Sequence, residues 1–428
     1  MKNSFSIEKI RKDRVILAAL ILAGADRASV MESLDELDAL CRSAGGEVVG
    51  KITQSAARIH PGHLFGTGKI QEIKELCRST KASLIIYDGD LTPSQQQKLE
   101  EIIDIAVIDR PALILDIFAR HARSREAITQ VQLAQLEYLL PRLTGNWSHL
   151  ERQEAAIGTR GPGETQLESD RRLVRKKILE LKKMLKRIDR ERDIQRKRRS
   201  RKINFCLVGY TNAGKTRLFN RLTGEKSYVA DKLFATLDST TRKLPIGGKE
   251  DILLTDTVGF IRKLPVDLVA SFRSTLKEAN TADTLLHVVD FSAHDIDEKI
   301  STVNRILKEI GCGEIKRLLI FNKTDLVDNP ELRRNMLARY KECLFVSAKT
   351  GEGIDLLFEK LGEIAAGLFS VQKARISRLD QRAIALLAGA MQISAGNVEG
   401  DDIVFIGRLA KYDLMRLEKA GIRFENAE

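Results

Sequence analysis

The chain has 428 residues, of which 43% are hydrophobic, and it carries a net charge of +12. A chain of this length exceeds what one hydrophobic core accommodates, so we expect two to four domains. The longest apolar run, Val15 to Ala25, is too short for a membrane span, and the scattered Cys and His residues lack the spacing of a disulfide framework or a zinc site. These features predict a cytoplasmic protein without a membrane span, with peripheral membrane association left open.

Residues 1–125 are predicted to form an α/β domain with a largely parallel sheet, because short apolar runs alternate with helical patterns. The expected elements are 14–22, 30–43, 47–52, 69–79, 82–87, 94–103 and 106–109. The glycine-rich loop HPGHLFGTGK at 60–69 could cradle a phosphate. It matches neither nucleotide fingerprint, so a structural turn is the preferred interpretation.

Residues 126–202 are predicted to form a long antiparallel helical hairpin. Apolar residues from Val131 to Leu143 line the first helix, and a heptad seam from Leu167 to Ile188 lines the second. Residues 170–202 carry 17 Lys and Arg against 5 Asp and Glu, a surplus as large as the net charge of the whole chain. An ordinary solvated helix balances its signs, so this run favours phosphate contact and a nucleic-acid partner.

Residues 203–369 are predicted to form a P-loop domain with a doubly wound sheet. GYTNAGKT at 209–216 matches G-x-x-x-x-G-K-[ST], whose backbone N–H groups cradle the α- and β-phosphates. In this motif Lys215 reaches the β/γ oxygens and Thr216 binds Mg²⁺. The candidate residues of the loop are Gly209, Tyr210, Thr211, Asn212, Ala213, Gly214, Lys215 and Thr216.

The base is predicted to be guanine because the chain reads NKTD at 322–325. The Asp325 carboxylate can accept hydrogen bonds from guanine N1–H and the 2-amino group, a pair that adenine lacks. After the last predicted strand, SAK at 347–349 supplies a backbone donor to guanine O6. The base-side candidates are Asn322, Lys323, Thr324, Asp325, Ser347, Ala348 and Lys349.

Two segments between these motifs are predicted to be nucleotide-sensitive switches. In FATLDSTTR at 234–242, Thr236 is the candidate for a hydroxyl that binds Mg²⁺ only when the γ-phosphate is present, with Thr240 and Thr241 as alternatives. In the D-x-x-G motif, Asp256 holds the metal through water and the Gly259 N–H senses the γ-phosphate. The switch candidates are Phe234, Ala235, Thr236, Leu237, Asp238, Asp256, Thr257, Val258 and Gly259.

The catalytic candidates are Lys215, Thr236 and Gly259, and the metal ligands are Thr216 and Thr236. Phe260 follows Gly259 where Ras-like enzymes carry a glutamine that orients the attacking water. Because phenylalanine cannot orient water, we expect slow basal hydrolysis and an outside activator.

The order of these motifs resembles one family. GTRGPGETQLESDRR at 158–172, a basic helix, and then GYTNAGKT, FATLDSTTR, DTVGF and NKTD resemble the HflX family of ribosome-associated GTPases over about residues 10–365. The resemblance implies a Mg²⁺-dependent GTP hydrolase that binds GTP and GDP, the 50S subunit, the 70S ribosome and ribosomal RNA. It implies that the ribosome stimulates hydrolysis, and that the GTP-bound protein splits stalled ribosomes under stress. We expect a monomer.

The sequence departs from the family pattern before its GTRGPGE segment, where Ala155 and Ala156 stand in a run that is usually glycine. Alanine disfavours positive φ by ~1 kcal/mol or more, so this loop or its approach to RNA differs. Arg217 is a second departure and adds a charge at the start of the helix after the phosphate loop. Residues 370–428 lie beyond the resemblance and are predicted to form a small α+β appendage, with helices at 379–389 and 411–420 and a strand at 402–407.

Three other interpretations share these motifs. A GTP-gated assembly factor would prefer immature 50S particles to 70S ribosomes and split nothing. A signalling GTPase would have a protein partner, and its basic hairpin would only keep it soluble. The N-terminal domain could also hold a second nucleotide such as ATP, although a fold alone does not establish that.

Overall fold

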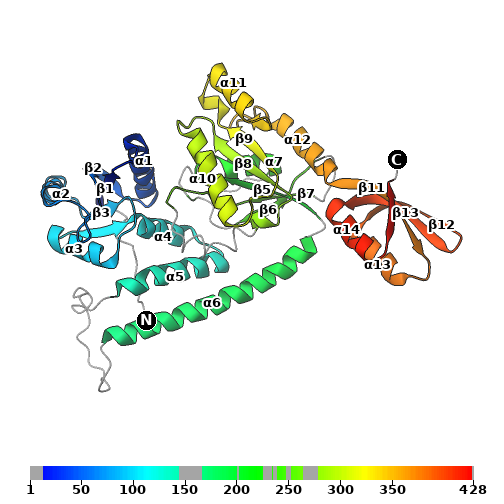
Figure 1. The fold of residues 1–428 in the computed structure, drawn as a ribbon, viewed down its shortest axis with the longest axis horizontal. Helices are drawn as coiled ribbons and strands as arrows, with labels where there is room; N and C mark the ends of the chain where they lie inside the picture. The colour runs from blue at the N-terminus through cyan, green and yellow to red at the C-terminus, as the bar shows by residue number, and fades with distance from the viewer. Residues whose placement is uncertain are drawn as a thin grey trace.

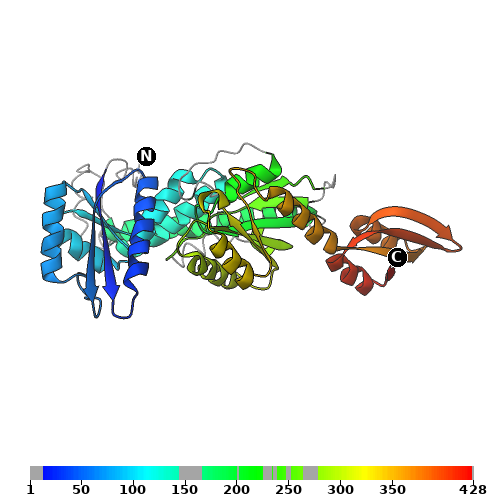
Figure 2. The ribbon, with the colours of Figure 1, turned by 90° about the horizontal axis from the view of Figure 1, so that it is seen from above.

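The computed structural model describes residues 13–143, 166–199, 202–224, 234, 239–246, 252–263 and 278–426. An N-terminal, a central and a C-terminal unit follow one another along the long axis, and a pair of helices runs along the first two (Figure 1, Figure 2). The α/β class expected from the sequence is confirmed. None of the described helices is both long and apolar enough to cross a bilayer.

The N-terminal unit is a parallel sheet with helices on both faces. Its strands, in sheet order, are β2 (Glu47–Ala56), β1 (Arg14–Leu22), β3 (Leu84–Tyr87) and β4 (Ala106–Asp109). Its helices are α1 (Arg27–Ser43), α2 (Thr67–Thr80), α3 (Pro93–Ile103) and α4 (Arg110–His121). In β1, Val15 and Leu17 pack with α1 and α4, whereas Ile16 and Ala18 pack with α2 and α3. Burial on both faces explains why this strand reads as one continuous apolar run.

The pair of helices consists of α5 (Arg125–Leu139), which a 3₁₀ turn extends at Leu140–Arg142, and α6 (Gln166–Arg199). They lie side by side and run in opposite directions (Figure 1). Their contact is made by apolar side chains of the heptad seam and its partner helix, namely Leu133, Val174, Ile178, Leu181 and Leu185. The loop predicted between the helices, with Ala155 and Ala156, lies outside the described residues.

The central unit is a six-stranded sheet in which only the edge strand β6 is antiparallel. In sheet order its strands are β10 (Cys343–Phe345), β9 (Arg317–Asn322), β8 (Thr284–Asp290), β5 (Ile203–Gly209), β7 (Ile252–Asp256) and β6 (Thr240–Lys243). Its described helices include α7 (Lys215–Thr223), α10 (Ile296–Glu309), α11 (Pro330–Arg339) and α12 (Ile354–Gly367). β5 lies between β7 and β8, so the order of the strands reverses at β5. Open α/β sheets bind ligands beyond the carboxyl ends of the strands at the position of such a reversal. The predicted nucleotide motifs follow β5, β7, β9 and β10 at this edge.

The C-terminal unit places two helices on one face of an antiparallel sheet. In sheet order its strands are β12 (Gln392–Glu399), β13 (Asp402–Ala410), β11 (Phe369–Ser377) and β14 (Arg423–Asn426), and its helices are α13 (Gln381–Ala390) and α14 (Lys411–Lys419). The sequence predicted both helices and β13. It did not predict β12, whose residues are all exposed, because a strand without a buried face shows no alternation of apolar and polar residues.

Burial of His287 in β8 predicts acid sensitivity of the fold. Burial, aided by the charges of Arg317 and Lys215, lowers the pKa of His287 from 6.5 to about 3. The unfolded chain therefore binds a proton below pH 6.5 that the folded chain excludes, and this contribution to stability is lost as the pH falls from 6.5 toward 3, at about 1.4 kcal/mol per pH unit. We expect His287→Gln to lose less unfolding free energy than the parent between pH 7 and pH 5.5 in urea titrations. Equal losses in both proteins would contradict this assignment.

Candidate nucleotide site

The phosphate loop, residues 209–214, connects β5 to α7 through backbone conformations that need glycine. Gly209 has a φ of +149°, and a Cβ there would lie 2.2 Å from the Val288 carbonyl oxygen. Gly214 has a φ of +87°, and a Cβ there would lie 2.3 Å from the side-chain nitrogen of Asn322. Larger residues are excluded at both ends of the loop. The loop leads into the N-terminus of α7, where backbone N–H groups and the helix dipole favour an anion.

Lys215 lies at the start of α7 with its ammonium group over the loop. Its Nζ donates to the carbonyl oxygens of Gly209 at 3.1 Å and Tyr210 at 2.8 Å. Burial lowers the pKa of Lys215 to about 8, and the charge of Asp256 opposes this shift. A phosphate at this position would favour the charged ammonium again.

Thr216 and Asp256 bring two oxygen ligands together. The Thr216 hydroxyl donates to Asp256 Oδ2 at 2.8 Å, and the Asp256 side chain is buried at the end of β7. Thr257, also buried, anchors this segment by donating its hydroxyl to the Leu207 carbonyl at 2.6 Å, and Val258 follows in the core. Hydroxyl and carboxylate oxygens are the donors that Mg²⁺ prefers, so the residues present fit this ion.

The base-side residues converge at the ends of β9 and β10. The Asn322 amide donates to the Ala213 carbonyl at 2.9 Å, and its oxygen accepts from the Ala348 N–H at 3.0 Å. Asn322 therefore joins the phosphate loop to the SAK segment. Asp325 accepts from the Ser347 hydroxyl at 2.6 Å, and Lys349 lies 3.8 Å from its other oxygen.

The remaining base-side candidates hold the loop around these contacts. Lys323 has a left-handed backbone with a φ of +67°, and its Nζ lies 2.7 Å from Asp290 Oδ2 at the end of β8. The Thr324 hydroxyl donates to Glu352 at 3.3 Å. The structure thus brings the two strong motifs of the sequence into one site.

Two phenylalanines of the site are buried toward the N-terminal unit. Phe260 belongs to the core that also contains residues of α1 and α4. Phe234 stacks edge-on against Phe118 of α4, with ring centroids 4.6 Å apart. The Phe234 side chain is 3% exposed and the Phe260 side chain 2%, so packing accounts for Phe260.

Four switch candidates, Ala235, Thr236, Leu237 and Asp238, lie outside the described residues. The alternatives to Thr236 are both in β6. The Thr241 hydroxyl lies 3.0 Å from that of Thr255 within the sheet, and Thr240 pairs with Asp256 across β6 and β7. Sequence reasoning missed Arg262 and Lys263, which contact the N-terminal unit, because two basic residues after D-x-x-G form no motif.

Three family models match the chain in succession. They are described as GTP-binding GTPase N-terminal, at residues 31–119, GTP-binding GTPase Middle Region, at 121–199, and 50S ribosome-binding GTPase, at 204–323. The GTPase HflX of Caldanaerobacter subterraneus subsp. tengcongensis is 44% identical over 373 residues, which cover 85% of this chain and 85% of that protein. The chain belongs to the HflX GTPase family.

Other HflX GTPases show a similar identity to this chain. That of Escherichia coli K12 is 46% identical over 79% of this chain and 80% of its own length, and that of Flavobacterium psychrophilum is 48% identical over 74% and 77%. Among solved structures, the crystal structure of SsGBP in complex with GDP is 26% identical, covers 83% of this chain and 99% of that chain, and has a TM-score of 0.47. The family resemblance of the sequence is confirmed, and membership of the HflX family makes the chain a GTP hydrolase.

Proposed function

We propose that this HflX GTPase is a cytoplasmic monomer that binds the 50S subunit and the 70S ribosome through ribosomal RNA. In its GTP-bound form it splits stalled ribosomes into subunits under stress, and hydrolysis releases it. The observation that carries this proposal is the basic outer surface of α6, which lies on the same chain as the nucleotide site. The match to a model described as 50S ribosome-binding GTPase supports the choice of partner.

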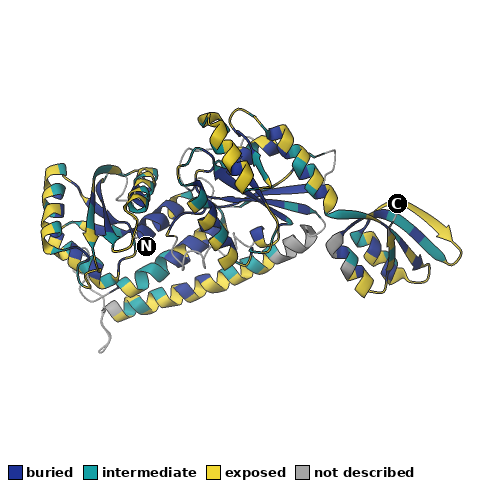
Figure 3. Cartoon of the chain, turned by 45° about the horizontal axis from the view of Figure 1, so that its top comes forward, coloured by how far each residue is buried: buried dark blue, intermediate teal, exposed yellow. Residues whose placement is uncertain are grey.

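The outer surface of α6 suits a phosphate backbone. The helix has 34 residues, which at ~1.5 Å per residue makes it about 50 Å long. The side of α6 that faces α5 is apolar. Over residues 168–192, the opposite side is exposed (Figure 3). Arg187 is 83% exposed, and the ion pair that it forms with Glu191 at 3.5 Å joins two exposed groups and is weak. Cations of this kind are available to RNA phosphates, whose binding releases counterions.

The nucleotide site supplies the GTP dependence. The loop amides and Lys215 would bind the phosphates, and Asp325 and Asn322 would select guanine. Thr216 and Thr236 would be the ligands of Mg²⁺, and Asp256 would hold the ion through water. The ion neutralises charge on the phosphates when it is bound. Phe260 cannot orient the attacking water, so basal hydrolysis is slow, and the ribosome supplies or orders the missing group.

The experiment that tests the proposal combines hydrolysis with particle analysis. Purified 50S, 30S and 70S particles are added to the full chain with GTP, and 70S profiles on sucrose gradients are compared between GTP and a non-hydrolysable analogue. We expect 50S and 70S to stimulate hydrolysis on the order of 10²-fold or more. We also expect the analogue-bound protein to convert 70S ribosomes into subunits.

Other outcomes would favour the other interpretations. Stimulation without dissociation, with preference for immature 50S particles, would indicate an assembly factor. No response to any particle would contradict ribosome binding and indicate a GTPase with a different partner.

A further inference from the structure

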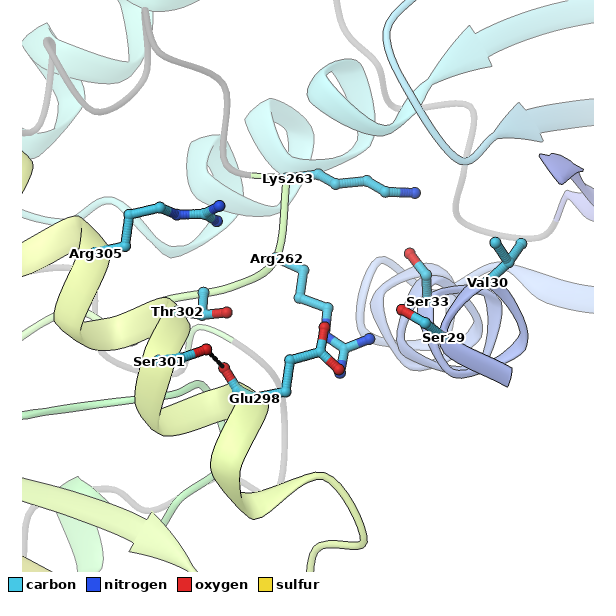
Figure 4. A pocket seen from close by; sticks show the side chains of 9 residues that line it. All are labelled: Ser29, Val30, Ser33, Arg262, Lys263, Glu298, Ser301, Thr302 and Arg305. Carbon is cyan, nitrogen blue, oxygen red and sulfur yellow. Dashed lines mark hydrogen bonds and ion pairs between the residues drawn. The ribbon is translucent and has the colours of Figure 1, made fainter. Parts of the chain in front are cut away.

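The cations beside the second switch are engaged with carboxylates of the protein itself. Arg262 bonds to Asp295 and Glu298, and Lys263 Nζ lies 2.6 Å from Asp88 Oδ2. Both cations line a cavity of about 470 Å³ between α1 and α10 (Figure 4). Their charges are thus satisfied within the fold. The C-terminal unit differs, because one edge of its sheet is open.

The open edge is β12, which is the outermost strand of the C-terminal sheet and pairs with β13 on one side. All of its residues are exposed (Figure 1, Figure 3). None of them belongs to the described core that α13 and α14 form with the other strands. An exposed edge strand presents a row of N–H and C=O groups with which another extended chain can pair.

The turn at the end of β12 shows which backbone groups face outward. A two-residue turn joins Glu399 to Asp402, and its first residue, Gly400, has a φ of +65°, as a type II′ turn requires. Glu399 and Asp402 are therefore a hydrogen-bonded pair, and such pairs alternate along an antiparallel ladder. It follows that Gly396 and Val398 direct their N–H and C=O groups away from β13. Within the described residues, no backbone hydrogen bond outside the helices and sheets involves either of them.

The side of β12 that faces the helices is apolar. Gly396 lies opposite Phe405, a half-buried ring at the margin of the core, and a Cβ on Gly396 would lie 3.5 Å from Phe405 Cδ1. Because glycine supplies no side chain, the Phe405 ring stays accessible at the edge. Ile393 and Val398 flank this position and are 41% and 59% exposed. An apolar side chain of an added strand would fit above Gly396, between these two.

The hairpin that contains β12 is acidic. Residues 392–402 include Glu399, Asp401 and Asp402 but no Lys or Arg, in a chain whose net charge is +12. Arg375 of β11 pairs with Glu399 at 2.8 Å and lies 4.0 Å from Asp402, whereas Asp401 is exposed. This end of the strand therefore repels phosphate groups and favours a basic partner.

We propose that the free edge of β12 binds an extended, basic segment of a partner protein, which adds a strand to the sheet and places an apolar side chain on Gly396. Hydrogen bonds to the outward groups of Gly396 and Val398 supply affinity, and the apolar face and the acidic turn supply specificity. A helix cannot satisfy these groups, because its own backbone groups are bonded internally. The site is separate from the nucleotide site and from the basic surface of α6, so it acts without the ribosome.

The test measures binding of a fluorescein-labelled peptide to the full chain by anisotropy. The peptide alternates Lys and Val over about nine residues, a length that spans one edge strand. We expect saturable binding, and peptides with a central Pro, or with Glu in place of Lys, should bind at least about fivefold more weakly. Val398→Pro removes an outward N–H but no bond to β13, and should weaken binding by a similar factor. Gly396→Val covers the Phe405 ring at the distance of an ordinary contact and should do the same.

The controls separate this site from general effects. Val371→Ala changes an exposed apolar residue on the opposite face of the sheet and should leave peptide affinity unchanged. Every variant should keep the parent affinity for GDP, which reports a folded chain.

Four results would overturn the proposal. The parent protein could fail to bind the Lys peptide, or Val398→Pro and Gly396→Val could both bind it as the parent does. Displacement of the peptide by single-stranded oligouridine would show that the edge accepts nucleic acid. Dimerisation in sedimentation that Val398→Pro abolishes would show that β12 pairs with a second copy of the chain.

Discussion

Neutralising four cations on the outer face of α6 is expected to weaken binding to the 50S subunit on the order of 10²- to 10³-fold at ~0.1 M salt. The substitutions are Lys182→Gln, Lys183→Gln, Lys186→Gln and Arg187→Gln. If all four side chains contact phosphates, each contributes about 0.7 to 0.9 to the slope of log affinity against log salt, so the slope should fall by about 3. The lost ion pair between Lys182 and Glu137, at 2.8 Å, is half exposed and costs little stability.

The measurement is the affinity for 50S particles across a series of salt concentrations. A matched control changes four exposed cations of the central unit, Lys308, Lys316, Arg334 and Lys341, to Gln, which alters the net charge equally. The control should keep most of the affinity and most of the slope. Loss of affinity in both variants would show a general charge effect, and loss in neither would mean that the basic surface of α6 only keeps the protein soluble.

Replacing Asp325 by Asn is expected to reduce the affinity for GDP and GTP by roughly 10²-fold and to improve binding of xanthosine nucleotides. The carboxylate accepts from two guanine donors, and its substitution by an amide removes the charge and sets one donor against another. Hydrogen bonds to charged groups contribute about 1.5 to 3 kcal/mol each, so the loss of one or two accounts for this factor. Xanthine carries an oxygen in place of the 2-amino group, and the amide can donate to it.

Fluorescent GDP and XDP would report both affinities. Asp328→Asn makes the same charge change three residues away at an exposed position and should affect neither nucleotide. If Asp325→Asn kept GDP affinity within about twofold, the base would be selected by other residues, and the assignment of NKTD as the base reader would fail.

The convergence of the phosphate-loop and NKTD residues could be predicted from the sequence because it depends on residues at fixed backbone positions. Gly209 and Gly214 allow backbone conformations that other residues rarely adopt, so the motif marks the turn after β5. The other motifs follow β7, β9 and β10, whose carboxyl ends lie at the same edge of the sheet. The first residue of a helix was harder to predict. The apolar pattern begins at Val30, whereas α1 begins at Arg27 because the Asp26 side chain accepts from the N–H groups of Ala28 and Ser29.

The contacts between the units could not be predicted at all. Lys263 and Asp88 are 175 residues apart, Tyr210 and Glu36 are 174 apart, and neither pair leaves a periodic pattern. Within the N-terminal unit, Asp88 also pairs with the buried Arg110. From the sequence alone an arginine is expected at the surface, because arginine is rarely buried unless it is paired with a carboxylate. Long-range ion pairs depend on how two completed units meet, and local propensity carries no information about that.

The C-terminal unit has a short connection to the central one. α12 ends at Gly367, β11 begins at Phe369, and both Leu368 and Phe369 pack against the core of the central sheet. Because α12 itself follows closely on the SAK segment, the C-terminal unit is joined to the nucleotide-binding unit through a helix and a short, packed connection. We therefore expect a fluorophore at the exposed Val398 to report the orientation of the central unit during GTP binding and hydrolysis, without an additional contribution from a flexible linker.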